Sequence, residues 1–204
     1  MALRKVQRPA GRRATVARKT KETDIELTLV VDGRGRYEVE TGIPFLNHML
    51  EIFTRHGFFD LTLRASGDLD VDYHHTVEDV GLVLGQAFRD ALADKAGIRR
   101  FGEATVPLDE ALVSTVVDLS GRPFLVYEVK IMQAKIGVFD VELIHDFLLA
   151  LTNQVGMNLH VRMASGRNPH HIVEATFKSL ARALDHACQR DPRVAGVLST
   201  KGSL

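Results

Sequence analysis

The sequence contains His74-His75-Thr76-Val77-Glu78 and, in its second half, His170-His171-Ile172-Val173-Glu174, two copies of the pattern His-His-x-x-Glu. Each copy follows a glycine-containing turn, Ala65-Ser66-Gly67 or Ala164-Ser165-Gly166, and opens a stretch of helical periodicity. On a helix, an imidazole and a carboxylate three or four positions apart share one face. These donors suit a divalent transition metal. A lone His pair is more often structural, but the repeat predicts two metal half-sites.

The elements around the two copies also repeat, as a hairpin, a helix, a strand and a second helix. In the first half these are expected at residues 25–31 with 37–40, 45–56, 61–64 and 74–94. In the second half they are expected at 111–119 with 124–131, 141–153, 159–162 and 170–189. The sequence therefore predicts a single α+β domain over residues 1–204, with two similar halves at about 22–98 and 108–190. Its helices would pack against mostly antiparallel sheets.

The composition is that of an ordinary globular protein, with 45% hydrophobic and 25% charged residues among 204. The formal net charge is zero, so no global field attracts nucleic acid or an anionic membrane. No apolar run approaches the roughly 20 residues that span a bilayer. The single Cys188 excludes an internal disulfide and fits a reducing cytoplasm, where we expect the protein to reside.

The one local charge imbalance lies at the start of the chain. Eight basic residues precede the first acid, Glu22: Arg4, Lys5, Arg8, Arg12, Arg13, Arg18, Lys19 and Lys21. An organellar transit peptide is one alternative, but the run is short and lacks an amphipathic stripe. We therefore expect a frayed basic arm before the first strand.

The repeat also identifies a possible ligand on the first helix of each half. Aligning Leu61 with Leu159 places His48 opposite Asp146, because each lies thirteen positions before its leucine. His145 is the rival, but adjacent residues are rotated by about 100° around a helix. The repeat therefore favours Asp146, and a plain surface aspartate remains the alternative.

Several motifs in one order resemble the imidazoleglycerol-phosphate dehydratases, enzymes of histidine biosynthesis, over nearly the whole chain. The segments that carry the resemblance are residues 21–23, 42–50, 72–79, 107–112, 118–123, 168–178 and 199–202. They include both His-His-x-x-Glu copies. The resemblance implies a lyase that dehydrates imidazoleglycerol phosphate to imidazoleacetol phosphate.

The resemblance further implies two divalent metal ions per active site, expected to be Mn²⁺. One ion would be held by His48, His75, His170 and Glu174, and the other by His74, Glu78, His171 and residue 146. Family members often have His at this last position with Glu before it, whereas this chain has His145-Asp146. Asn47 is a second departure, since the family usually has Asp there. An amide would orient the neighbouring imidazole more weakly than a carboxylate.

By the same resemblance, Glu22 is the candidate for acid–base work on the substrate carbon. The phosphate would be bound by Arg100, Arg122, Lys178, Ser199 and Lys201, and guanidinium groups suit such contacts. Taken alone, each of these residues is most simply an exposed polar or charged side chain. The family assembles twenty-four subunits with sites between neighbours, so the resemblance also implies a homo-oligomer.

Two other classes of function are compatible with the motif. A metal-binding or storage protein would need only the His-His-x-x-Glu pairs and would have no use for phosphate-binding groups. A metallohydrolase would use a metal-bound hydroxide and would release no keto product. Turnover of imidazoleglycerol phosphate with added manganese separates these classes.

Overall fold

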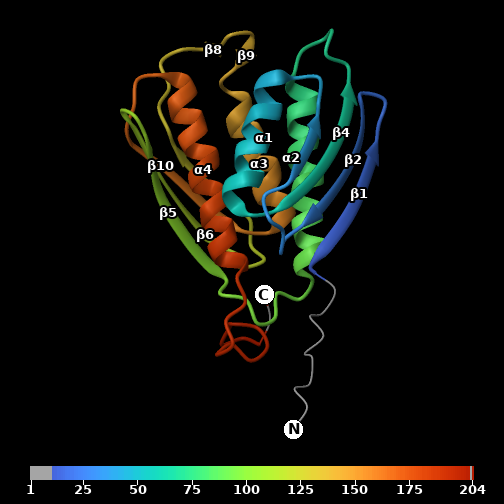
Figure 1. The fold of residues 1–204 in the computed structure, drawn as a ribbon, viewed down its shortest axis with the longest axis vertical. Coiled ribbons are helices and arrows are strands. Elements are labelled where there is room, and N and C mark those ends of the chain that lie inside the picture. Colours follow the sequence, from blue (N-terminus) through green and yellow to red (C-terminus); the bar gives the residue numbers. More distant parts are fainter. Residues whose placement is uncertain (1–10, 203) are drawn as a thin grey trace.

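The computed structural model describes residues 11–202 and 204. Within these residues four helices lie between two larger sheets (Figure 1). The helices are α1 (Pro44–Gly57), α2 (His74–Leu92), α3 (Leu143–Val155) and α4 (Pro169–Cys188). The first sheet contains β1 (Arg13–Lys19), β2 (Thr23–Val30), β3 (Tyr37–Glu40) and β4 (Asp60–Gly67). The second contains β5 (Phe101–Leu108), β6 (Ala111–Asp118), β7 (Phe124–Glu128) and β10 (Asn158–Ser165).

The two sheets of the described chain have the same strand order, β1-β2-β4-β3 and β5-β6-β10-β7. In each sheet the last strand pairs in parallel, β3 with β4 and β7 with β10, and the other pairs are antiparallel. A small ribbon of β8 (Lys135–Ile136) and β9 (Phe139–Asp140) precedes α3. The predicted α+β class with two similar halves is confirmed.

The predicted strand partners within each half are wrong. The segment at 37–40 does not return beside 25–31, because β4 lies between β2 and β3, and β10 separates β6 from β7 in the same way. The connection after β2 instead crosses the start of β4, where Asp60 accepts the backbone N–H groups of Arg34 and Arg36. The hairpins are β1–β2 and β5–β6. They include two strands that the periodicity did not indicate.

The expected basic arm is also corrected, because Arg13–Lys19 forms β1 and pairs with β2 along its whole length. Its alternate residues Ala14 and Val16 pack against the core. Arg4, Lys5 and Arg8 lie outside the described residues.

The hydrophobic core lies between the two sheets, and the strands bury the side chains of the face that is turned toward it. Along β2, Ile25, Leu27 and Leu29 are fully buried while the residues between them are not, as expected for a strand with one covered face. The predicted helices are confirmed, with ends that shift by a few residues, and Pro44 begins α1. No helix in the described part of the chain is long and apolar enough to span a membrane.

Candidate metal and substrate site

The two His-His-x-x-Glu copies occupy the first turns of α2 and α4, and the chain enters both helices in the same way. Asp72 accepts the backbone N–H of His74 at 2.7 Å, and Asn168 accepts that of His170 at 2.9 Å. Each side-chain oxygen satisfies a donor that the first helical turn cannot pair internally. The first histidine of each pair is thereby fixed at the helix start.

The glycines before these helices permit a close approach of strand and helix. A Cβ on Gly67 would lie 2.0 Å from the hydroxyl oxygen of Thr76, and one on Gly166 would lie 2.6 Å from a side-chain carbon of Ile172. Thr76 and Ile172 occupy the same position in the two copies. The repeat of Ala-Ser-Gly therefore has a packing reason, which is that any larger residue would push each helix start away from its sheet.

His48 of α1 meets His170 and Glu174 of α4. Within the described residues these three form the one group whose ligand atoms all lie within 4.8 Å of one another. Lys178, one turn further along α4, lies 2.7 Å from the second oxygen of Glu174. Burial of Glu174 disfavours its charged form, but the hydrogen bonds and charge of Lys178 and the bond from His170 outweigh this and lower its pKa.

The equivalent group of the other half is formed by α2 and α3. Asp146 lies 3.4 Å from Nδ1 of His74, and Glu78 lies 3.7 Å from Nε2 of the same ring. The alignment of the two halves is thus matched by the fold, since His48 and Asp146 each face the first histidine of the opposite half's repeat. The carboxylates lie on different sides of the ring, however, so these three do not converge as closely as the first group.

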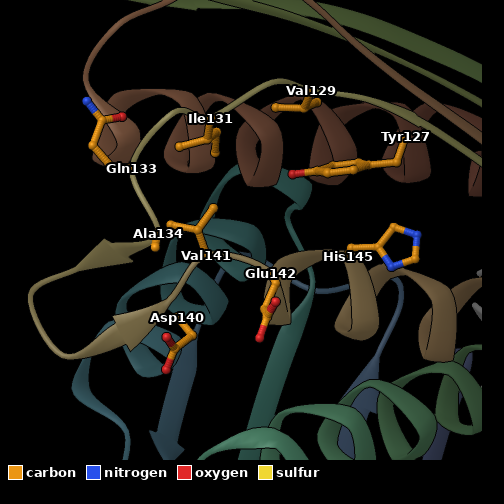
Figure 2. A pocket seen from close by; sticks show the side chains of 9 residues that line it. All are labelled: Tyr127, Val129, Ile131, Gln133, Ala134, Asp140, Val141, Glu142 and His145. Carbon is orange, nitrogen blue, oxygen red and sulfur yellow. The ribbon is translucent and has the colours of Figure 1, made fainter.

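His145 lies against Tyr127, with ring centroids 5.8 Å apart, and its Nδ1 is 3.4 Å from Asp146. Both rings line a cavity of about 340 Å³ beside the start of α3, and Figure 2 shows the side chains around it. Burial raises the pKa of the Tyr127 phenol. The ring of His145 therefore lines this cavity, while Asp146 has the contact with His74.

The second histidine of each pair points away from the first. The rings of His74 and His75 are inclined by 82°, and those of His170 and His171 by 87°. Nδ1 of His75 lies 3.0 Å from Asp68, and Nδ1 of His171 lies 2.8 Å from Glu110. The hydrogen bonds to these carboxylates raise the pKa of both imidazoles.

Glu110 is the more strongly held of these two carboxylates. Its Oε1 accepts the backbone N–H groups of Asn168 at 2.7 Å and Arg167 at 3.1 Å, while Oε2 faces His171. The hydrogen bonds from Asn168, His171 and Arg167 lower the pKa of Glu110 to about 2. A carboxylate that is charged at neutral pH is an acceptor only, so Nδ1 of His171 carries a proton; in the neutral ring the lone pair is then on Nε2, which lies 3.9 Å from Asp109.

Asp68 and Glu110 were not identified from the sequence as site residues. Both lie outside the helical motif, and only the tertiary fold brings their carboxylates to the ring nitrogens of His75 and His171. The expected role of residue 47 is also different, because Asn47 accepts the backbone N–H and the hydroxyl of Thr41 at 3.0 and 2.6 Å. Asn47 therefore fixes the loop before α1 and makes no hydrogen bond to His48.

Glu22 lies in the turn between β1 and β2, with its carboxylate 4.0 Å from Nε2 of His75 and about half exposed. The ends of this turn are tied to α2, because Arg18 and Thr23 both bond the buried carboxylate of Asp79. Glu22 therefore faces His75 from a turn that is fixed at both ends. Among the described residues, its carboxylate makes no hydrogen bond.

The residues predicted to bind phosphate are divided by the fold. Lys178 pairs with Glu174, beside His48 and His170, whereas Arg100 pairs with Asp118 and donates to the carbonyl of Leu198 near the C-terminus. Arg122 follows β6, and Ser199 and Lys201 share the C-terminal turn. Glu110 lies directly before β6 and Asp118 ends it, and this strand spans roughly 24 Å. Within one chain, most of the residues predicted to bind phosphate therefore lie far from the histidines of the two repeats.

The sequence between residues 41 and 184 matches the family model described as imidazoleglycerol-phosphate dehydratase. The enzyme of that name from Geobacter sulfurreducens is 58% identical over 194 residues, which covers 95% of this chain and all of the relative. The chain belongs to the imidazoleglycerol-phosphate dehydratase family. It is therefore an enzyme of the hydro-lyase class and a dehydratase of histidine biosynthesis.

Two solved structures are similar to this dehydratase throughout. The Staphylococcus aureus imidazoleglycerol-phosphate dehydratase is 35% identical with a TM-score of 0.80, covering 88% of this chain and 99% of that one. The Pyrococcus furiosus protein, described as in complex with (S)-C348, is 38% identical with a TM-score of 0.80, covering 93% and 100%. The fold described above is thus similar to that of both solved structures over nearly their whole length.

Proposed function

We propose that the chain dehydrates imidazoleglycerol phosphate to imidazoleacetol phosphate in the cytoplasm, with two divalent metal ions, Mn²⁺ best, at each active site. The observation that carries the proposal is the convergence of His48, His170 and Glu174 together with its counterpart around His74. Imidazole and carboxylate donors in this arrangement fit a divalent metal. The implied fourth ligands are His75 and His171, which do not join the group of His48, His170 and Glu174 and instead face Asp68 and Glu110.

The direction of these rings supports an active site shared between copies of the chain. His75 and His171 are oriented by carboxylates but do not join the three-residue groups of their own chain. Arg100, Arg122, Ser199 and Lys201 lie at the far end of the sheet. A homo-oligomer, a shell of twenty-four subunits by family resemblance, would bring these parts together. No nucleic acid or membrane has a place in this function.

The chemistry asked of the chain is loss of water across two side-chain carbons of the substrate. When bound, the metals would favour the imidazolate form of the substrate ring, which then serves as the electron reservoir. Glu22, whose carboxylate makes no hydrogen bond among the described residues, takes the proton from one of these two carbons. The hydroxyl group on the other carbon accepts a proton and leaves as water, and the resulting enol becomes the ketone. Cationic side chains hold the phosphate.

The test is turnover by chelator-stripped protein with and without added Mn²⁺, with the product followed by mass spectrometry as loss of one water. We expect no turnover in the stripped protein and recovery on reconstitution. Full activity without metal would contradict the proposal. Release of inorganic phosphate would indicate a metallohydrolase, and tight metal binding without turnover would indicate a storage protein.

A further inference from the structure

Glu22 and Glu110 occupy the same position in the two halves of the fold. Leu61 of β4 pairs with Leu29 of β2, and its counterpart Leu159 of β10 pairs with Val117 of β6. Glu22 lies seven residues before Leu29, and Glu110 lies seven residues before Val117. Each glutamate therefore ends the turn of a hairpin, directly before β2 or β6, and each faces the second histidine of a His-His pair.

The two glutamates differ in the ring nitrogen that they face. In the first half Asp68, the residue after Gly67, takes Nδ1 of His75 and leaves Glu22 on the Nε2 side at 4.0 Å. In the second half the residue after Gly166 is Arg167, which has no acceptor for an imidazole N–H. Glu110 takes Nδ1 of His171 in its place.

Resting on the proposed function, we propose that Glu110 is a positioning residue that commits Nε2 of His171 to the metal, while its counterpart Glu22 is left free for proton transfer. Glu110 uses one oxygen to hold the backbone before α4 and the other to hold the ring. Glu110 thereby fixes both the tautomer and the direction of the ring, as the hydrogen-bond partners of metal-binding histidines commonly do. The two glutamates have different roles because the residue after the glycine is Asp68 in the first half and Arg167 in the second.

The discriminating variant is Glu110→Gln, which keeps size and shape. If the amide oxygen stays on the backbone N–H groups, the amide nitrogen faces Nδ1 of His171 and favours the proton on Nε2, where no metal can then bind. If the amide is rotated by 180°, its N–H₂ group faces the backbone N–H groups of Arg167 and Asn168, which then lose their acceptor. Either arrangement should weaken one of the two Mn²⁺ binding steps by about 10- to 100-fold.

Mn²⁺ binding to the full-length, chelator-stripped protein would be followed by electron paramagnetic resonance of the free ion, without reference to activity. Among the residues that the structure describes, the side chain of Asp68 bonds only Nδ1 of His75 and could turn an amide oxygen to it, so Asp68→Ala, which removes the acceptor, is the corresponding variant and should weaken the other step through His75. Glu22→Gln should leave both steps unchanged while turnover is lost. In a His171→Ala background, Glu110→Gln should have no further effect on Mn²⁺ affinity, because its action passes through that ring.

Wild-type Mn²⁺ affinity in Glu110→Gln, with or without a lower unfolding temperature of the stripped protein, would overturn the inference and leave the proposed function standing. An added loss in the His171→Ala background would do the same, since it would show that Glu110 acts on the metal by another route. Absence of Mn²⁺ binding by the wild-type chain would instead refute the proposed function itself.

Discussion

Replacing Asp146 by Ala tests the pairing of the two halves at the ligand position that the internal repeat predicts. Asp146 lies 3.4 Å from Nδ1 of His74, at the place that His48 takes beside His170. His145→Ala is the matched control, because it changes the adjacent residue of the same helix. Its ring lies against Tyr127 and lines the neighbouring cavity.

The expected magnitude follows from the number of donors. Asp146 would supply one of four ligands to the second metal, and loss of even a hydrogen-bonding partner of a ligand costs 10- to 100-fold in metal affinity. Loss of the ligand itself should reach about 100-fold, which corresponds to ~2.8 kcal/mol. Asp146→Ala should therefore weaken one Mn²⁺ per chain by this factor, and turnover should fall sharply. His145→Ala should change affinity several-fold at most.

The assay is Mn²⁺ content per chain after equilibrium dialysis over a range of free metal, with turnover measured on the same samples. Asp146→His is a rescue variant, because an imidazole at this position would again offer a metal donor, as His48 does in the other half. Restored binding in that variant would support a direct ligand role. Loss of metal in His145→Ala with retention in Asp146→Ala would refute the alignment of the halves.

Three further outcomes are expected. Arg122→Ala or Lys201→Ala should each reduce kcat/KM by about 10- to 100-fold, through loss of a charge-assisted phosphate contact, with Mn²⁺ content unchanged; loss of metal would contradict their assignment. Arg12→Ala should lower the unfolding free energy by ~1–2 kcal/mol in denaturant titrations, a modest value because its partner Asp32 is half exposed. The hydrogen bond from Arg12 lowers the pKa of Asp32, so this difference should be present above the ordinary aspartate pKa and vanish as pH falls through the lower, folded value. Burial raises the pKa of Cys188 to about 12, so a thiol reagent should label it only as the protein unfolds; rapid labelling of native protein would disagree with the structure.

The sequence alone determined the features that depend on local spacing. The helical positions of His74 and Glu78, the start of α1 at Pro44 and the α+β class follow from periodicity and turn residues, which act over a few positions. The repeat also predicted that Asp146 would correspond to His48, because both halves preserve the same number of residues between helix and strand. The two His-His-x-x-Glu copies and the pair His48 and Asp146 were predicted as metal ligands from the repeat, whereas the division of these ligands between two ions, Glu22 and the phosphate residues came from the family resemblance; all of them remain predictions.

Tertiary structure alone decided which strands pair and which carboxylates reach the rings. A strand's alternation shows which face is buried but not which neighbour it takes, so the sequence suggested adjacent hairpins where β4 and β10 are inserted. Asp68 and Glu110 likewise carry no local pattern. Glu110 lies 61 positions from His171 along the chain, and only the packing of α4 against the β5–β6 hairpin brings the carboxylate within 2.8 Å of its ring nitrogen.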